Sequence, residues 1–122
     1  MKKTGGAIMR TLVVVLLAYL TSSFSALAYD PLDCLDDIAR AYPTMIVGLA
    51  TQLCSAAWSP EPVKCYSLVT NVYNQIPRGI AIDLCAGSTN AKDTVSCYGK
   101  AADRGLNRGL ATTLCGAKKQ ER

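Results

Sequence analysis

GLATQLC, at residues 48–54, returns twice in this chain, as GIAIDLC at residues 79–85 and as GLATTLC at residues 109–115. Five of the seven positions agree in residue type in all three copies. The aliphatic residues and the cysteine fall at i, i+1, i+4 and i+5, which is one face of an α-helix. The sequence therefore predicts three similar helices, each of which ends at a cysteine.

The six cysteines follow the same period. Successive cysteines are separated by 20, 11, 20, 12 and 18 residues, so equivalent cysteines recur every 30 to 32 residues. Periods of this length are typical of stacked supersecondary units. Turn-forming residues lie midway between the two cysteines of each unit: Tyr42-Pro43-Thr44, Gln75-Ile76-Pro77 and Arg104-Gly105. Each unit is therefore predicted to be a helix, a turn and a second helix.

Signals for a helix start precede the first cysteine of each unit. Asp30-Pro31 and Ser59-Pro60 each offer an N-cap residue with proline at the first helical position, and Asn90 is expected to cap the third unit. We predict an all-α fold of three tandem helical hairpins, either a short α-solenoid or a compact helical array. The expected units are residues 29–59, 60–90 and 91–122.

Hairpin geometry also predicts the disulfides. In an antiparallel pair of helices, the start of the first helix lies beside the end of the second, and the two cysteines of each unit occupy these places. The predicted bridges are Cys34 with Cys54, Cys65 with Cys85 and Cys97 with Cys115. The main alternative joins neighbouring hairpins, through Cys54 with Cys65 and Cys85 with Cys97.

Residues 1–28 have the pattern of a secretory signal peptide. A basic start precedes a short apolar run at residues 12–20, and Ala26 and Ala28 are the small residues before an expected cleavage at Tyr29. The run is short of the roughly 20 residues that a membrane-spanning helix needs. We therefore expect one small domain without a stable membrane span, in the periplasm or outside the cell, where disulfides form.

The charge of the chain is modest but unevenly distributed. The net charge of +4 falls to +1 when the three basic residues of the signal peptide are removed, so general attraction to nucleic acid is not indicated. Residues 29–59 carry −3, residues 60–90 are balanced and residues 91–122 carry +4. This gradient makes the molecule a dipole.

Two groups of residues are candidates for binding. Lys100, Arg104 and Arg108 are expected to form a basic patch for an anionic envelope component or an acidic partner. The alternatives for this charge are a solvated surface and head-to-tail self-association.

The second group is aromatic. Trp58, between the first and second units, is either a binding anchor or a seal between two packed hairpins. Tyr66 and Tyr98 follow the first cysteine of their units. They either pack beside the disulfide or form an aromatic row.

Residues for catalysis are scarce. The chain contains no histidine, and its cysteine spacings do not match the close pairs of zinc sites. Asp33, Asp36 and Asp37 cluster at a predicted helix start, where the helix dipole favours negative charge, so they are not assigned as an acid–base pair. We predict no catalytic residue, no metal site and no cofactor.

The resulting hypothesis is an exported, non-enzymatic interaction module with an unknown partner. Repeated helical units expose extended surfaces that suit this role. A carrier of a small apolar ligand such as a lipid is the second hypothesis, because half of the residues are hydrophobic. A secreted toxin or a histidine-free enzyme ranks third.

Overall fold

The computed structural model describes residues 28–117, a range that contains six α-helices and no strand. The predicted all-α class is confirmed. Three longer helices of 11 to 13 residues alternate with three helices of eight. In chain order they are α2 (Pro31–Ala41), α3 (Val47–Cys54), α4 (Glu61–Val72), α5 (Arg78–Cys85), α6 (Ala91–Asp103) and α7 (Arg108–Cys115). The predicted signal peptide lies outside the described residues, apart from Ala28.

The six helices form three hairpins, and one disulfide closes each hairpin. Hairpin 1 is α2 with α3, hairpin 2 is α4 with α5, and hairpin 3 is α6 with α7. The bridges are Cys34–Cys54, Cys65–Cys85 and Cys97–Cys115, with Cα–Cα distances of 5.6, 5.4 and 5.7 Å. The within-hairpin prediction is therefore confirmed, and the pairing between neighbouring hairpins is wrong. Three structural disulfides are typical of a protein that matures in an oxidising compartment.

The helix starts follow the predicted caps, with one shift. Asp30 forms a capping box with Asp33, and the Asn90 side chain accepts a hydrogen bond from the backbone N–H of Asp93. In hairpin 2 the helix begins at Glu61 rather than at Pro60. Ser59 nevertheless accepts a hydrogen bond from the Glu61 N–H at 3.3 Å, so its hydroxyl still serves the start of the helix.

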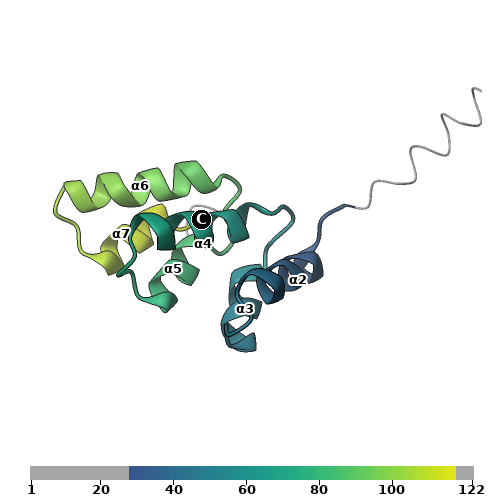
Figure 1. Cartoon of the computed structure of the whole chain (residues 1–122). Coiled ribbons are helices and arrows are strands. Elements are labelled where there is room, and N and C mark those ends of the chain that lie inside the picture. Colours follow the sequence, from purple (N-terminus) through teal and green to yellow (C-terminus); the bar gives the residue numbers. More distant parts are fainter. Residues whose placement is uncertain (1–27, 118–122) are drawn as a thin grey trace, which may run out of the picture.

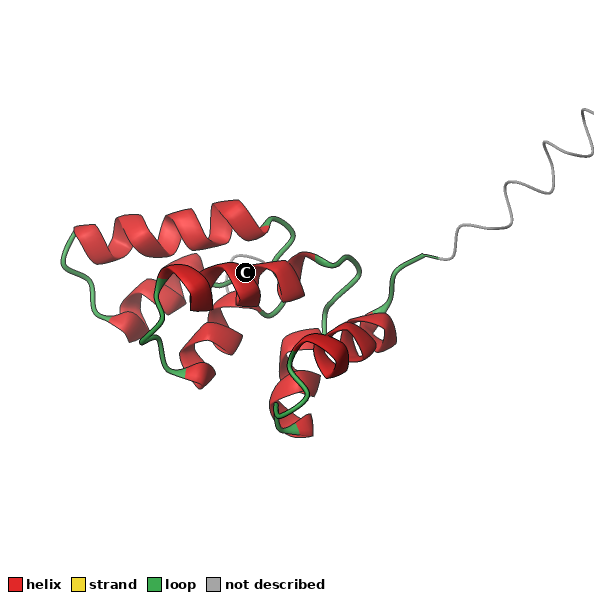
Figure 2. Cartoon of the chain, viewed as in Figure 1, coloured by secondary structure: helices red, strands yellow, loops and turns green. Residues whose placement is uncertain are grey.

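The hairpins stack in chain order. The helices α2, α4 and α6 form one row of contacts and α3, α5 and α7 form the other, and the substantial contacts join helices of one hairpin or of neighbouring hairpins. Figure 1 shows hairpin 3 at the opposite end of the molecule from hairpin 1, with hairpin 2 between them. Short loops connect the helices (Figure 2). Within residues 28–117, none of the helices has the length and apolar character required to cross a bilayer.

A tyrosine pair recurs at both junctions between hairpins. Tyr42 meets Tyr66 edge-on with ring centroids 5.0 Å apart, and Tyr73 meets Tyr98 in the same way at 5.3 Å. The first member of each pair is the C-cap residue of a longer helix, and the second follows the first cysteine of the next hairpin. Such pairs contribute to packing beyond their buried area. The repeated contact sets how one hairpin sits on the next.

Candidate docking groove

Three equivalent leucines have different surroundings. Leu53, Leu84 and Leu114 each precede the second cysteine of a hairpin, but the first two are 0% exposed and Leu114 is 60% exposed. The helices α3 and α5 each pack against a following hairpin. Within the described residues, no following hairpin covers α7. Hairpin 3 therefore presents to solvent the side that hairpins 1 and 2 bury.

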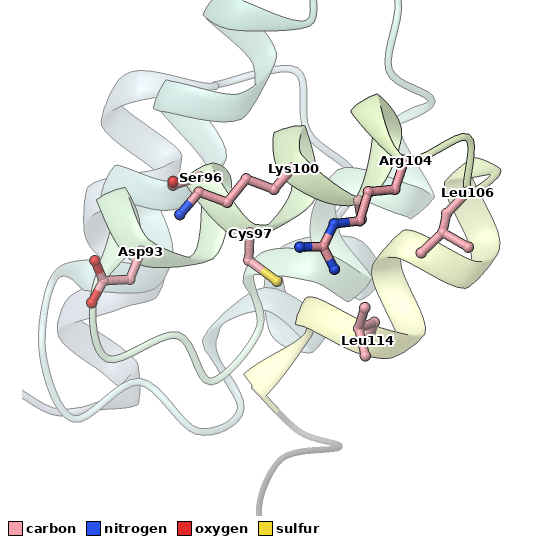
Figure 3. A pocket seen from close by; sticks show the side chains of 8 residues that line it. Asp93, Ser96, Cys97, Lys100, Arg104, Leu106 and Leu114 are labelled. Carbon is pink, nitrogen blue, oxygen red and sulfur yellow. The ribbon is translucent and has the colours of Figure 1, made fainter.

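A groove of about 440 Å³ lies on this side of hairpin 3 (Figure 3). We call it the α6/α7 groove. Its lining residues come from both helices and the loop between them: Asp93, Ser96, Cys97, Lys100, Ala101, Arg104, Leu106 and Leu114. Cys97 is half-buried, whereas the equivalent Cys34 and Cys65 are fully buried, which shows the same loss of cover.

The groove combines an apolar side with two cations. Figure 3 shows Arg104 extending from the end of α6 across the groove, opposite Leu106 and Leu114, while Lys100 runs along α6 towards Ser96. Both basic side chains are exposed, and among the described residues neither has a salt-bridge partner. Asp93 supplies negative charge to the same lining. An apolar surface flanked by two available cations suits a ligand that has apolar side chains and carboxylates.

Two of the three residues of the predicted basic patch line the groove. Lys100 and Arg104 lie together in the groove lining, as their four-residue spacing predicts. Arg108 begins α7 and does not line the groove, because the turn at Gly105 carries the chain to the start of the next helix. The grouping of Arg108 with the other two in one basic patch stays a prediction.

The aromatic candidates lie elsewhere. Trp58 is 73% exposed, so the interpretation that it seals the joint between hairpins 1 and 2 is wrong. Tyr66 and Tyr98 are buried, and each packs on a tyrosine of the preceding hairpin. They stabilise the stack and offer no aromatic row to a ligand.

The acidic residues of hairpin 1 are mostly engaged within the helix. Asp30 and Asp33 cap α2, and Asp37 lies 2.6 Å from the Arg40 guanidinium and accepts the Tyr29 hydroxyl hydrogen at 2.8 Å. Burial and this hydrogen bond to Asp37 raise the pKa of Tyr29 well above its ordinary value. Of the predicted cluster of Asp33, Asp36 and Asp37, only Asp33 lies in the first turn of α2, so the helix-start interpretation is confirmed for Asp33 and is wrong for the other two.

Asp36 differs from them. It is exposed, and among the described residues its carboxylate has no ion-pair partner. It remains available to a molecule that approaches hairpin 1.

In comparisons with protein-family models, curated proteins and solved structures, nothing matches the chain.

The structure offers little for metal or thiol chemistry. Within residues 28–117, no group of three or more histidine, cysteine, aspartate or glutamate side chains is arranged to hold a metal ion. All six cysteines lie in this range and are joined in disulfides.

The apolar side of the groove was missed at the sequence level. Leu114 lies in the seven-residue repeat at residues 109–115, which differs from the repeat at residues 48–54 at one position. The local sequence pattern therefore does not mark Leu114 as exposed. One signal is present: Gly105 occupies the place of the junction tyrosines Tyr42 and Tyr73. Hairpin 3 thus lacks the side chain that hairpins 1 and 2 use to receive the next hairpin.

Proposed function

We propose that this chain is a non-catalytic interaction module of the periplasm or the cell exterior, which binds another protein chain through the α6/α7 groove. The observation that carries the proposal is the exposure of Leu114 at a position that is fully buried in hairpins 1 and 2. A side of a hairpin that is built for stacking, and that nothing covers among the described residues, is a surface suited to a protein partner.

The charge of the groove defines the partner's chemistry. Lys100 and Arg104 are exposed beside the apolar lining. Interfaces of this kind have an apolar centre, and the charges at their rim select the partner and speed its approach. We therefore propose a partner that places an apolar side chain against Leu114 and a carboxylate against Arg104.

The test is site-specific photo-crosslinking in cells that produce the full chain. The probe p-benzoylphenylalanine is placed at position 114, and at position 72 as a matched control, because Val72 is also exposed but lies on hairpin 2. We expect an adduct with one protein species of defined mass from position 114 and none from position 72. Arg104→Glu should abolish the adduct, and Arg78→Glu in hairpin 2 should not. Equal labelling from both positions, or none from position 114, contradicts the proposal.

A carrier of a small apolar ligand is the second candidate. The groove volume of about 440 Å³ supports it, since ligand sites have volumes of roughly 300–1,000 Å³. Native mass spectrometry of protein purified from its own cell separates the two candidates. A retained mass of a few hundred daltons favours the carrier, and a retained protein chain favours the module.

A further inference from the structure

We propose that the partner of the α6/α7 groove is hairpin 1 of a second copy of this chain, so that chains join head to tail. This inference rests on the proposed function of the groove as a docking surface, and it names the occupant.

Hairpin 1 has an open side that is complementary to the open side of hairpin 3. Leu32 stands two residues before the first cysteine of its hairpin and is 69% exposed. The equivalent Val63 is half-buried and Val95 is buried, because each belongs to a hairpin that packs against a preceding one. In α3, Thr51 is exposed where the equivalent Ile82 is fully buried. Hairpin 1 therefore leaves open the side with which hairpins 2 and 3 receive their predecessors.

We call this open side the α2/α3 face. It comprises Leu32, Leu35, Asp36 and Thr51. Hairpin 3 has an open side of the type that contacts a following hairpin, and hairpin 1 has an open side of the type that contacts a preceding one. Two copies can thus repeat between them the junction that occurs twice within each chain.

The residues that would meet at such a junction also fit one another. Inside the chain, Tyr73 packs on Tyr98. The Tyr73 hydroxyl occupies the space that a side chain at position 99 would need, and that position is Gly99. At a joint between copies, Gly105 replaces the first tyrosine, Leu35 replaces the second, and Asp36 stands in the place of Gly99. The missing tyrosine ring leaves room for the larger Asp36 side chain.

The presence of Asp36 in the place of Gly99 brings opposite charges together. Arg104 directly precedes Gly105, so we expect its long side chain to reach Asp36 of the next copy. Within one chain, both side chains are exposed and neither has an ion-pair partner among the described residues. The net charges of the two units are also opposite, since residues 29–59 carry −3 and residues 91–122 carry +4. The joint is complementary in both apolar pattern and charge.

Such an interface is heterologous, since two different surfaces meet. It leaves one open side at each end of any assembly, so association continues into open chains unless the rotation closes a ring. Exposed charges contribute to it, so it should weaken as salt screens them.

The experiment is sedimentation velocity on protein purified after expression of the full chain, over rising concentrations and at low and high salt. Four variants accompany the wild type: Asp36→Arg, Arg104→Asp, the double exchange of both, and Arg78→Asp as an exposed control on hairpin 2. Circular dichroism of each variant verifies that the helices are retained.

We expect species larger than a dimer whose fraction grows with concentration and falls with salt. Each single variant at the joint should raise the concentration for half-association by at least about tenfold, because like charges then face each other. The double exchange should restore association to within about threefold of wild type, since the pair is reversed but intact. Arg78→Asp should behave as wild type.

A protein that stays monomeric up to about 1 mM overturns the inference, since even a weak complex forms there. So does association that the single variants leave unchanged or that the double exchange fails to restore. A photo-adduct from position 114 to residues 118–122 of the same chain also overturns it, because the groove is then covered internally. An adduct to a different protein overturns the self-association but leaves the proposed function standing, whereas absence of any adduct removes both.

Discussion

Tyr73 packs edge-on against Tyr98, with ring centroids 5.3 Å apart and an angle of 71° between the ring planes. Tyr73 is the C-cap residue of α4, and its N–H donates to the Val69 carbonyl. The end of α4 thus positions the Tyr73 ring against hairpin 3. Since Tyr42 and Tyr66 repeat this relationship, the stack is built from one junction used twice. The open sides of hairpins 1 and 3 carry Leu35 and Gly105 at the two tyrosine positions of that junction.

The tyrosine pair should be energetically coupled. We expect a double-mutant cycle with Tyr73→Leu and Tyr98→Leu to give a coupling of about 0.5–1.5 kcal/mol, because the edge-on contact is lost in either single variant. Urea unfolding measures the four proteins. The cycle of Tyr42→Leu with Tyr98→Leu is the control, since these residues belong to different junctions, and its coupling should stay below about 0.5 kcal/mol. Equal coupling in the two cycles would contradict the pairing.

Equivalent leucines should respond differently to truncation. Leu84→Ala opens a cavity in a fully buried site and is expected to lower the free energy of unfolding by about 2–5 kcal/mol. Leu114→Ala removes a side chain that is 60% exposed and should cost less than about 1 kcal/mol. Urea unfolding of dilute protein, where self-association is absent, gives both values. A large loss for Leu114→Ala would mean that the α6/α7 groove is covered within the chain.

These leucines also show how far the sequence predicts the structure. Cysteine spacing and turn residues correctly predict the three hairpins and the disulfides, because hairpin geometry is local. Burial at the junctions depends on which hairpin lies next to which. The seven-residue repeats that end at Cys54 and Cys115 differ at one position, yet the leucine before the cysteine is buried in the first and exposed in the second.

The aromatic residues and the basic patch were harder to place for the same reason. Trp58 is exposed although it lies in a linker between packed hairpins, and Tyr66 is buried although it could equally have faced a ligand. Neighbours from another hairpin decide both outcomes. Arg108 lies past the turn, as the sequence indicates, but which residues beyond the turn line the groove depends on how α6 and α7 pack.

The disulfide of hairpin 2 should contribute strongly to stability. Its loop spans 20 residues, and on the chain-entropy model such a bridge stabilises the fold by roughly 3 kcal/mol. Replacing Cys65 and Cys85 together by Ala should therefore lower the free energy of unfolding by about that amount, as measured in urea. Peptide mapping of the wild type without reduction is the control, and a peptide that joins Cys54 to Cys65 would contradict the hairpin assignment.

Glu61 connects the starts of two helices, and its removal should loosen hairpin 3. Its Oε2 accepts a hydrogen bond at 2.8 Å from the N–H of Ala91, a donor in the first turn of α6 that has no partner within its own helix. Its Oε1 lies 3.5 Å from the Lys64 ammonium. Glu61→Ala should cost about 1–2 kcal/mol and speed amide hydrogen exchange at Ala91, because a partly buried donor loses its acceptor.

Glu61→Gln keeps an acceptor oxygen and should cost less, and Lys64→Ala should cost below about 0.5 kcal/mol, since it removes only an exposed ion pair. If Lys64→Ala destabilises the protein as much as Glu61→Ala does, or if exchange at Ala91 is unchanged in Glu61→Ala, the carboxylate acts through the ion pair and does not hold α6 in place.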